Sequence, residues 1–115
     1  MPLRSLRGER AFQRLRKGRP GRGRLVAVRW MPLTRHDPHL EPSTHEVRVG
    51  IVVSKKVGKA VVRNKVRRRL REILRRTHLP PCELVVVAQP EAANASYAEL
   101  LRDLTQALKK AGLVQ

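Results

Sequence analysis

Residues 54–76 read SKKVGKAVVRNKVRRRLREILRR and hold eleven of the chain's 26 Lys and Arg residues with a single acid, Glu72. When these residues are plotted at about 100° per residue, one sector is apolar and the opposite sector is polar. The apolar positions are Val62, Val66, Leu70, Ile73 and Leu74, and the opposite positions are Asn64, Arg68, Arg71 and Arg75. The pattern predicts an amphipathic helix that packs on a core and exposes a row of cations. Gly58 is predicted to turn the backbone before this helix begins.

The exposed face of this helix is unfavourable in isolation. Arg67, Arg71 and Arg75 are spaced four residues apart, and like charges at that spacing cost about 0.2–0.5 kcal/mol each. Arg68 and Glu72 are predicted to form the favourable pair. A helix selected for folding alone would mix charges on its exposed face, so the pattern favours a polyanionic partner over a merely solvated surface.

The chain as a whole is strongly basic, with a net charge of +17 over 115 residues. Residues 1–24 contribute +8 and residues 54–76 contribute +10, whereas the other segments are nearly neutral. This length fits one domain, and this charge indicates a nucleic-acid partner, through two separate surfaces or one large one. Cys82 is the single cysteine and is predicted to be a small buried hydrophobe. The absence of a signal peptide and of a long apolar run predicts a cytoplasmic protein.

The segments before the basic stretch predict a helix, a turn, a strand and a loop. We expect a helix over residues 6–17, with Ala11, Phe12 and Leu15 inward and Gly18 as its stop. Residues 17–24 are rich in Gly, Pro and Arg and predict a basic turn, and residues 25–30 predict a strand. Residues 31–44 predict a loop, and we expect residues 1–6 and 31–45 to be flexible.

The second half of the chain predicts a strand, the basic helix, a strand and a final helix. Alternating apolar residues predict a strand over 47–53, and an apolar run predicts a buried strand over 84–88. Ser96 and Glu99 form a capping box that opens the last helix, which Gly112 closes. The inward positions predicted for that helix are Leu100, Leu101, Leu104, Ala107, Leu108 and Ala111. The strands at 47–53 and 84–88 should run parallel, as in a βαβ unit.

No set of residues predicts catalysis or metal binding by the protein itself. His36, His39 and His45 lie in the Pro-rich loop near Asp37 and Glu41, but their spacing matches no closed ligand pattern. The nine acids are scattered, and no nucleophile has a base near it in the sequence. We therefore predict no catalytic residue and no metal site.

The segment Ser54-Lys55-Lys56-Val57-Gly58, followed by Ala60 to Glu72, resembles the signature of the bacterial ribonuclease P protein subunit. The hallmark of that family is an Arg-Asn-Arg triplet in this helix, and Arg63-Asn64-Lys65 matches two of its three positions. Lys65 keeps the charge but lacks the planar fork that grips phosphate. Weaker similarity covers residues 9–12, 47–53, 83–88 and 96–113.

The resemblance implies an α+β fold, a single-domain α/β sandwich in the order α-β-β-β-α-β-α. Its first strand is expected to be short or missing. In that family the crossover around the basic helix is left-handed, although general sterics favour the opposite hand. The whole chain, residues 1–115, is then one RNA-binding domain.

The resemblance also implies a function. The RNA subunit, with Mg²⁺ held mainly by that RNA, removes the 5′ leader of precursor tRNA, and the protein binds this RNA and the leader. No cofactor bound by the protein alone and no further protein partner is expected. The predicted RNA-binding residues are Lys55, Lys56, Lys59, Arg63, Asn64, Lys65, Arg67, Arg68, Arg71 and Arg75. The predicted leader-binding cleft contains Phe12, Arg16 and Val28, and its aromatic positions are partly replaced here, which favours binding by charge and shape.

Three other interpretations remain open at this stage. A basic ribosomal or other structured-RNA-binding protein would share the charge and the fold, and only the signature argues against it. A membrane-surface protein could use the basic amphipathic helix, although that helix has no Trp or Phe on its apolar face. A protein nuclease would cleave RNA without an RNA cofactor.

Overall fold

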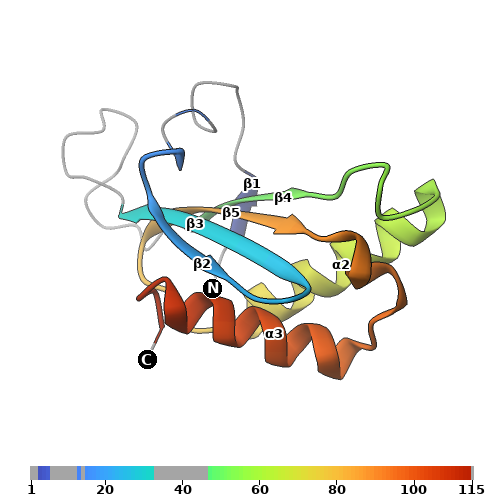
Figure 1. Cartoon of the computed structure of the whole chain (residues 1–115). Helices are drawn as coiled ribbons and strands as arrows, with labels where there is room; N and C mark the ends of the chain where they lie inside the picture. The colour runs from blue at the N-terminus through green and yellow to red at the C-terminus, as the bar shows by residue number, and fades with distance from the viewer. Residues whose placement is uncertain (1–2, 6–12, 14, 33–46, 115) are drawn as a thin grey trace.

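A five-stranded sheet carries two long helices on one face (Figure 1). The computed structural model describes residues 3–5, 13, 15–32 and 47–114. The elements are β1 (Leu3–Ser5), β2 (Arg19–Arg22), β3 (Val26–Pro32), β4 (Val47–Val52), α2 (Ala60–Arg76), β5 (Cys82–Ala88), the short 3₁₀ helix η1 (Pro90–Asn94) and α3 (Tyr97–Lys110). From β2 onward this order confirms the predicted α+β arrangement. The predicted first helix lies largely outside the described residues, of which Gln13 and Leu15 are helical.

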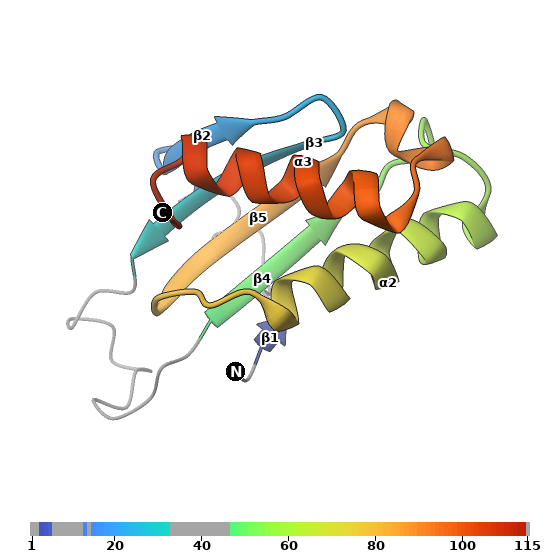
Figure 2. The same ribbon diagram turned by 90° about the horizontal axis from the view of Figure 1, so that it is seen from below.

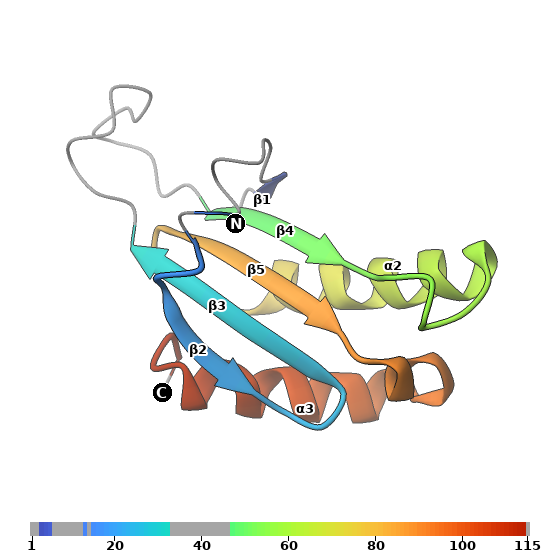
Figure 3. The ribbon, with the colours of Figure 1, turned by 45° about the horizontal axis from the view of Figure 1, so that its top comes forward.

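The strands are ordered β1-β4-β5-β3-β2, so β2 forms one edge of the described sheet, whereas α2 packs near β4, toward the other edge. β4 and β5 are parallel neighbours joined through α2, which confirms the predicted βαβ unit, and β3 is antiparallel to both β5 and β2. Figure 2 shows the sheet from the helix side. When its strands are turned to point upward, β5 lies to the left of β4, which makes the crossover left-handed. Figure 3, from the other face, agrees.

The core lies between the sheet and the two helices. Alternate residues of β4, among them Val47 and Val49, are buried against this layer, as the period-2 pattern predicts. From α2 the buried residues are Val66, Leu70, Ile73 and Leu74, and from α3 they are Leu100, Leu104, Ala107 and Leu108. Cys82 is fully buried, and burial raises the pKa of its thiol to about 12. The predicted capping box at Ser96 and Glu99 is present.

The prediction of a turn over residues 17–24 was wrong, because Arg19–Arg22 form β2 and pair with β3. Pro20 is tolerated since β2 is an edge strand of the described sheet, where a missing N–H need not break a ladder. Gly21 is required by packing, because a Cβ at this position would lie 2.1 Å from the carbonyl oxygen of Ala107 in α3. The carboxylate of Asp103 holds the hairpin that follows by accepting hydrogen bonds from three backbone N–H groups, at 2.8–3.0 Å.

The structure differs from the sequence predictions in three smaller respects, namely the ends of two strands, the exposure of one leucine and the presence of β1. β3 continues through Met31 and Pro32, which were predicted to begin the loop, because β5 begins at Cys82 and pairs with these residues. Leu101 was predicted to face inward but is 42% exposed, since the core-facing stripe of α3 is centred on Leu100 and Leu104. The prediction that residues 1–6 are flexible did not anticipate β1, which pairs with the otherwise open edge of β4.

Candidate nucleic-acid interface

A tight turn joins β4 to α2 and exposes three lysines, Lys55, Lys56 and Lys59. The backbone N–H of Val57 donates to the carbonyl of Ser54 at 3.0 Å, and that of Gly58 donates to the carbonyl of Lys55 at 3.2 Å. Gly58 has a φ of +152°, a conformation that favours glycine, so its predicted role as a turn is confirmed. The buried side chain of Val57 anchors the turn to the core and leaves the lysines in solvent.

α2 separates its apolar and cationic faces as the periodicity predicts. Its four buried residues face the core, and Val62 is half-buried beside them. Of the predicted RNA-binding residues on this helix, Asn64, Lys65, Arg68, Arg71 and Arg75 are exposed, whereas Arg63 and Arg67 are half-buried. A phosphate backbone lying along α2 would therefore meet several side chains at once.

The charge of α2 is poorly compensated by the protein. The helix has no acid in its first turn, and its N-cap, Lys59, makes no side-chain cap bond. Within the described residues, Arg68 has no hydrogen-bond or ion-pair partner. The Nε of Arg63 is buried without an acceptor, a state that costs about 1–3 kcal/mol or more for a charged group. A bound anion would relieve the repulsion along the exposed face of the helix.

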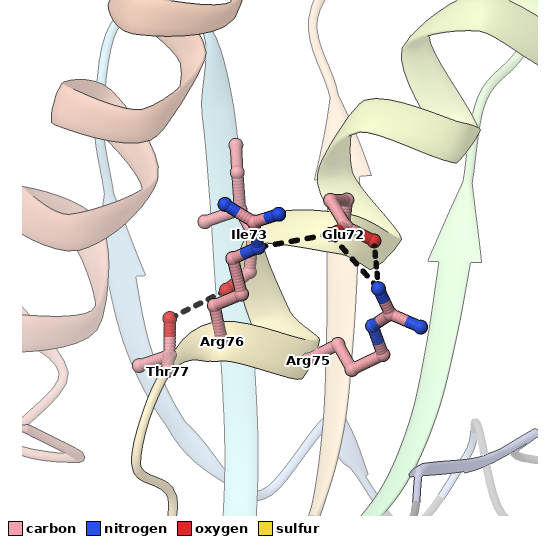
Figure 4. A network of polar contacts seen from close by, with 5 residues as sticks. All are labelled: Glu72, Ile73, Arg75, Arg76 and Thr77. Atoms are coloured by element: carbon pink, nitrogen blue, oxygen red, sulfur yellow. Dashed lines mark hydrogen bonds and ion pairs between the residues drawn. The ribbon is translucent and has the colours of Figure 1, made fainter.

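Glu72, the single acid of α2, binds two arginines at the end of the helix (Figure 4). Its carboxylate lies 2.8 Å from a terminal nitrogen of Arg75 and 2.9 Å from Nε of Arg76. The hydrogen bond from Arg75 is the main cause that lowers the pKa of Glu72. The predicted pair with Arg68 was wrong, because a glutamate pairs better with a base that follows it on the helix than with one that precedes it. Arg68 is left available for an external ligand.

Two further contacts fix the positions of side chains on α2. Arg67 donates to the side-chain oxygen of Asn64 at 3.1 Å, so the middle residue of the predicted triplet also orients a neighbouring guanidinium. Arg69 donates to the carbonyl of Ala95 at 3.0 Å and so binds α2 to the end of η1. Arg69 is therefore a structural residue, a role that helical spacing alone does not reveal.

The opposite face of the sheet holds a cavity of about 310 Å³. Its walls include Leu15, Arg16, Ala27, Arg29, Val85 and Val87. Leu15 is buried and packs on Met31 and Val85, as its predicted inward position requires. The Arg29 guanidinium donates to the carbonyl of Arg16 at 2.5 Å, so both arginines lie at this opening. The cavity combines an apolar floor with positive charge, which suits a base attached to a phosphate backbone.

The three residues of the predicted cleft have different positions. Arg16 is exposed and lines the cavity. Val28 also lines it, but Val28 is only 3% exposed and belongs to the core cluster beneath the helices, so a ligand would meet Ala27 and Arg29 first. Sequence reasoning missed Arg29, which the alternation along β3 could have placed on this face. Phe12 lies outside the described residues.

Other kinds of site are not formed by the part of the chain that the structure describes. Within those residues, no three His, Cys, Asp or Glu side chains are arranged to hold a metal ion. The three histidines of the predicted loop lie outside those residues. No described helix is long and apolar enough to cross a bilayer.

The sequence model of the family described as Ribonuclease P matches residues 2–112. The chain belongs to this family. The ribonuclease P protein component of Thermus thermophilus is 66% identical over 113 residues, which cover 98% of this chain and 63% of that protein. The chain thus spans less than two thirds of this relative's length. The ribonuclease P protein component of Streptomyces bikiniensis is 47% identical over 100 residues, covering 84% of this chain and 80% of that protein.

A solved ribonuclease P structure supports the same membership. The RNase P protein of Staphylococcus aureus superposes with a TM-score of 0.78 at 27% identity. The superposition covers 96% of this chain and 97% of that one. The α+β architecture described above is therefore the architecture of a known ribonuclease P protein.

Proposed function

We propose that this chain acts as the protein subunit of ribonuclease P. In this proposal it binds the catalytic RNA and the 5′ leader of precursor tRNA, and it assists the Mg²⁺-dependent cleavage that removes the leader. The RNA supplies the reacting groups and holds most of the Mg²⁺, and no protein residue is catalytic. The observation that carries the proposal is the cationic face of α2, on which Asn64, Lys65 and Arg68 are exposed and Arg68 has no partner among the described residues.

In this proposal the two RNAs bind on opposite faces of the protein. The cationic face of α2 binds phosphates of the catalytic RNA together with the lysines of the preceding turn. The cavity on the other face, between Arg16 and Arg29, receives the leader. Because the sheet separates the two, one protein can contact enzyme RNA and substrate at the same time. No further protein partner takes part.

The proposal places the protein in the cytoplasm. The single thiol, that of Cys82, is free and buried, which fits a compartment that does not rely on disulfides.

Reconstitution tests this function directly. The purified chain is added to a ribonuclease P RNA, and cleavage of a precursor tRNA is followed at low Mg²⁺. We expect clear stimulation of cleavage, and no cleavage by the chain without the RNA. Absence of stimulation would favour a structured-RNA-binding protein without a processing role. Cleavage by the protein alone would identify a protein nuclease.

A further inference from the structure

Among the described strands β2 forms an edge of the sheet, and this edge continues the positive charge of the cavity. Arg22 is exposed and is the register partner of Ala27, which lines the cavity. Directly paired residues of an antiparallel ladder point to the same face of the sheet. The side chain of Arg22 therefore lies on the open face of the sheet, beside the cavity, where Figure 3 shows β2 as the strand next to β3.

Two more cations stand close to Arg22 at this edge. The ammonium group of Lys110 donates to the backbone carbonyl of Arg22 at 3.3 Å. Arg24 is exposed two residues further along the chain, on the α3 side of the hairpin, where its charge also acts on Glu99. We call Arg22, Arg24 and Lys110 the edge cluster. The acid Asp103 lies behind this hairpin, and its carboxylate is occupied by three backbone N–H groups.

Stability of the fold can explain why single cations occur at these positions, but it does not explain why they lie next to the cavity. A lysine in the last turn of α3 is favoured by the helix dipole, and charges on a free edge strand oppose pairing with another sheet. Neither effect requires arginines both in the cavity, at Arg16 and Arg29, and on the same face of the neighbouring edge strand, at Arg22. Such a series matches the repeating charge of a nucleic-acid backbone.

The dimensions of the cavity show why a leader would reach this edge. Its volume of about 310 Å³ is near the lower limit for a ligand pocket, so it holds only a small part of an oligonucleotide. Neighbouring strands are about 4.8 Å apart, which places β2 about 7 Å from the middle of the cavity floor between β3 and β5. Successive phosphates of a stacked strand are about 3.4 Å apart along its axis. Two or three nucleotides beyond the cavity are thus enough to reach Arg22, by roughly that spacing.

We propose that the edge cluster binds phosphates of the leader nucleotides that extend beyond the cavity, over the free edge of β2. This inference rests on the proposed function of the cavity as a leader site. It adds a second contact for longer leaders, at the edge of the sheet that is farther from α2. Precursors with longer leaders then bind more tightly through charge, without recognition of their sequence.

Leader length tests the inference in the complete complex of protein and ribonuclease P RNA. Binding of precursor tRNAs with leaders of about two and about eight nucleotides is measured, since only the longer one spans the edge at about 3.4 Å per nucleotide. We expect Arg22→Gln to weaken binding of the long-leader precursor by about two- to fivefold, as for an exposed ion pair. Binding of the short-leader precursor should not change. Lys109→Gln, which removes the same charge from an exposed position outside the cluster, should leave both precursors unaffected.

Each other outcome has a defined meaning. If the long leader binds more tightly than the short one but Arg22→Gln and Arg24→Gln have no effect, the edge contact is refuted and the proposed function stands. Equal losses for both leaders would place Arg22 against another part of the RNA and would also refute the inference. If leader length has no effect on the unaltered protein, no contact beyond the cavity contributes to binding, and the inference is refuted. The circular dichroism spectrum of each variant checks that β2 is intact.

Discussion

Replacing Arg68 by alanine should weaken RNA binding without weakening the fold. Arg68 is exposed on α2 and has no partner among the described residues, so no intramolecular contact is lost. Its neighbours at the i−3 and i+3 positions, Lys65 and Arg71, are also cationic. Removing Arg68 relieves about 0.2–0.5 kcal/mol of repulsion for each such pair, and alanine is the best helix former. We therefore expect the thermal midpoint of the variant to stay the same or rise.

The binding effect follows from the loss of one phosphate contact. Each neutralised phosphate contributes about 0.9 to the slope of log affinity against log salt for a duplex. The slope for Arg68→Ala should thus be shallower by about one. Over a fourfold rise in salt the unaltered protein should then lose about 3.5-fold more affinity than the variant, because four raised to the power 0.9 is about 3.5.

The assay is titration of ribonuclease P RNA with protein at several salt concentrations, together with thermal melting of each protein alone. Arg76→Ala is the matched control, because it removes the same charge from an exposed side chain whose partner is Glu72. The control should keep the original slope. An unchanged slope for Arg68→Ala would place this residue outside the interface, and a clear fall in its melting temperature would refute the claim that the side chain contributes nothing to folding.

Three further predictions concern stability and reactivity. Asp103→Ala should lower the free energy of unfolding in urea by about 3 kcal/mol, because three hydrogen bonds to a charged group are lost. The control Gln106→Ala, on the same helix, should change the free energy of unfolding by less than about 0.5 kcal/mol. Equal effects of the two substitutions would contradict the role of Asp103 in holding the hairpin. Hydrogen bonds with Ser96 lower the pKa of Glu99 below its ordinary value of 4.5. The ionised carboxylate of Glu99 therefore stabilises the fold above pH 4.5, and this stabilisation is lost as the pH falls through the lowered pKa. Melting temperatures of Glu99→Gln should therefore fall less steeply below that pH than those of the unaltered protein, and parallel curves would refute the assignment. The thiol of Cys82, with a pKa raised to about 12, should resist a thiol reagent at about pH 8 until denaturant is added; rapid labelling of the folded protein would show that this strand opens.

Sequence periodicity was sufficient for the elements whose residues alternate strongly between apolar and polar. The buried and exposed faces of α2 follow from the spacing of Val66, Leu70 and Arg68, because a helix places residues three and four apart on one side. β4 and the capping box of α3 were predicted for the same reason, since their signals depend only on neighbours along the chain. The total charge of +17 likewise indicates a nucleic-acid partner without reference to the fold.

Only the tertiary structure determined how distant segments meet. β2 could not be predicted from a Gly- and Pro-rich segment, because it is held by packing of Gly21 under α3 and by the carboxylate of Asp103, about eighty residues away in the sequence. The burial of Val28 depended on which face of β3 the helices cover. Local sequence determines the elements that have a strong periodic pattern, whereas β2, the cavity, the edge cluster and the hand of the crossover arise from contacts between elements, which no local pattern encodes.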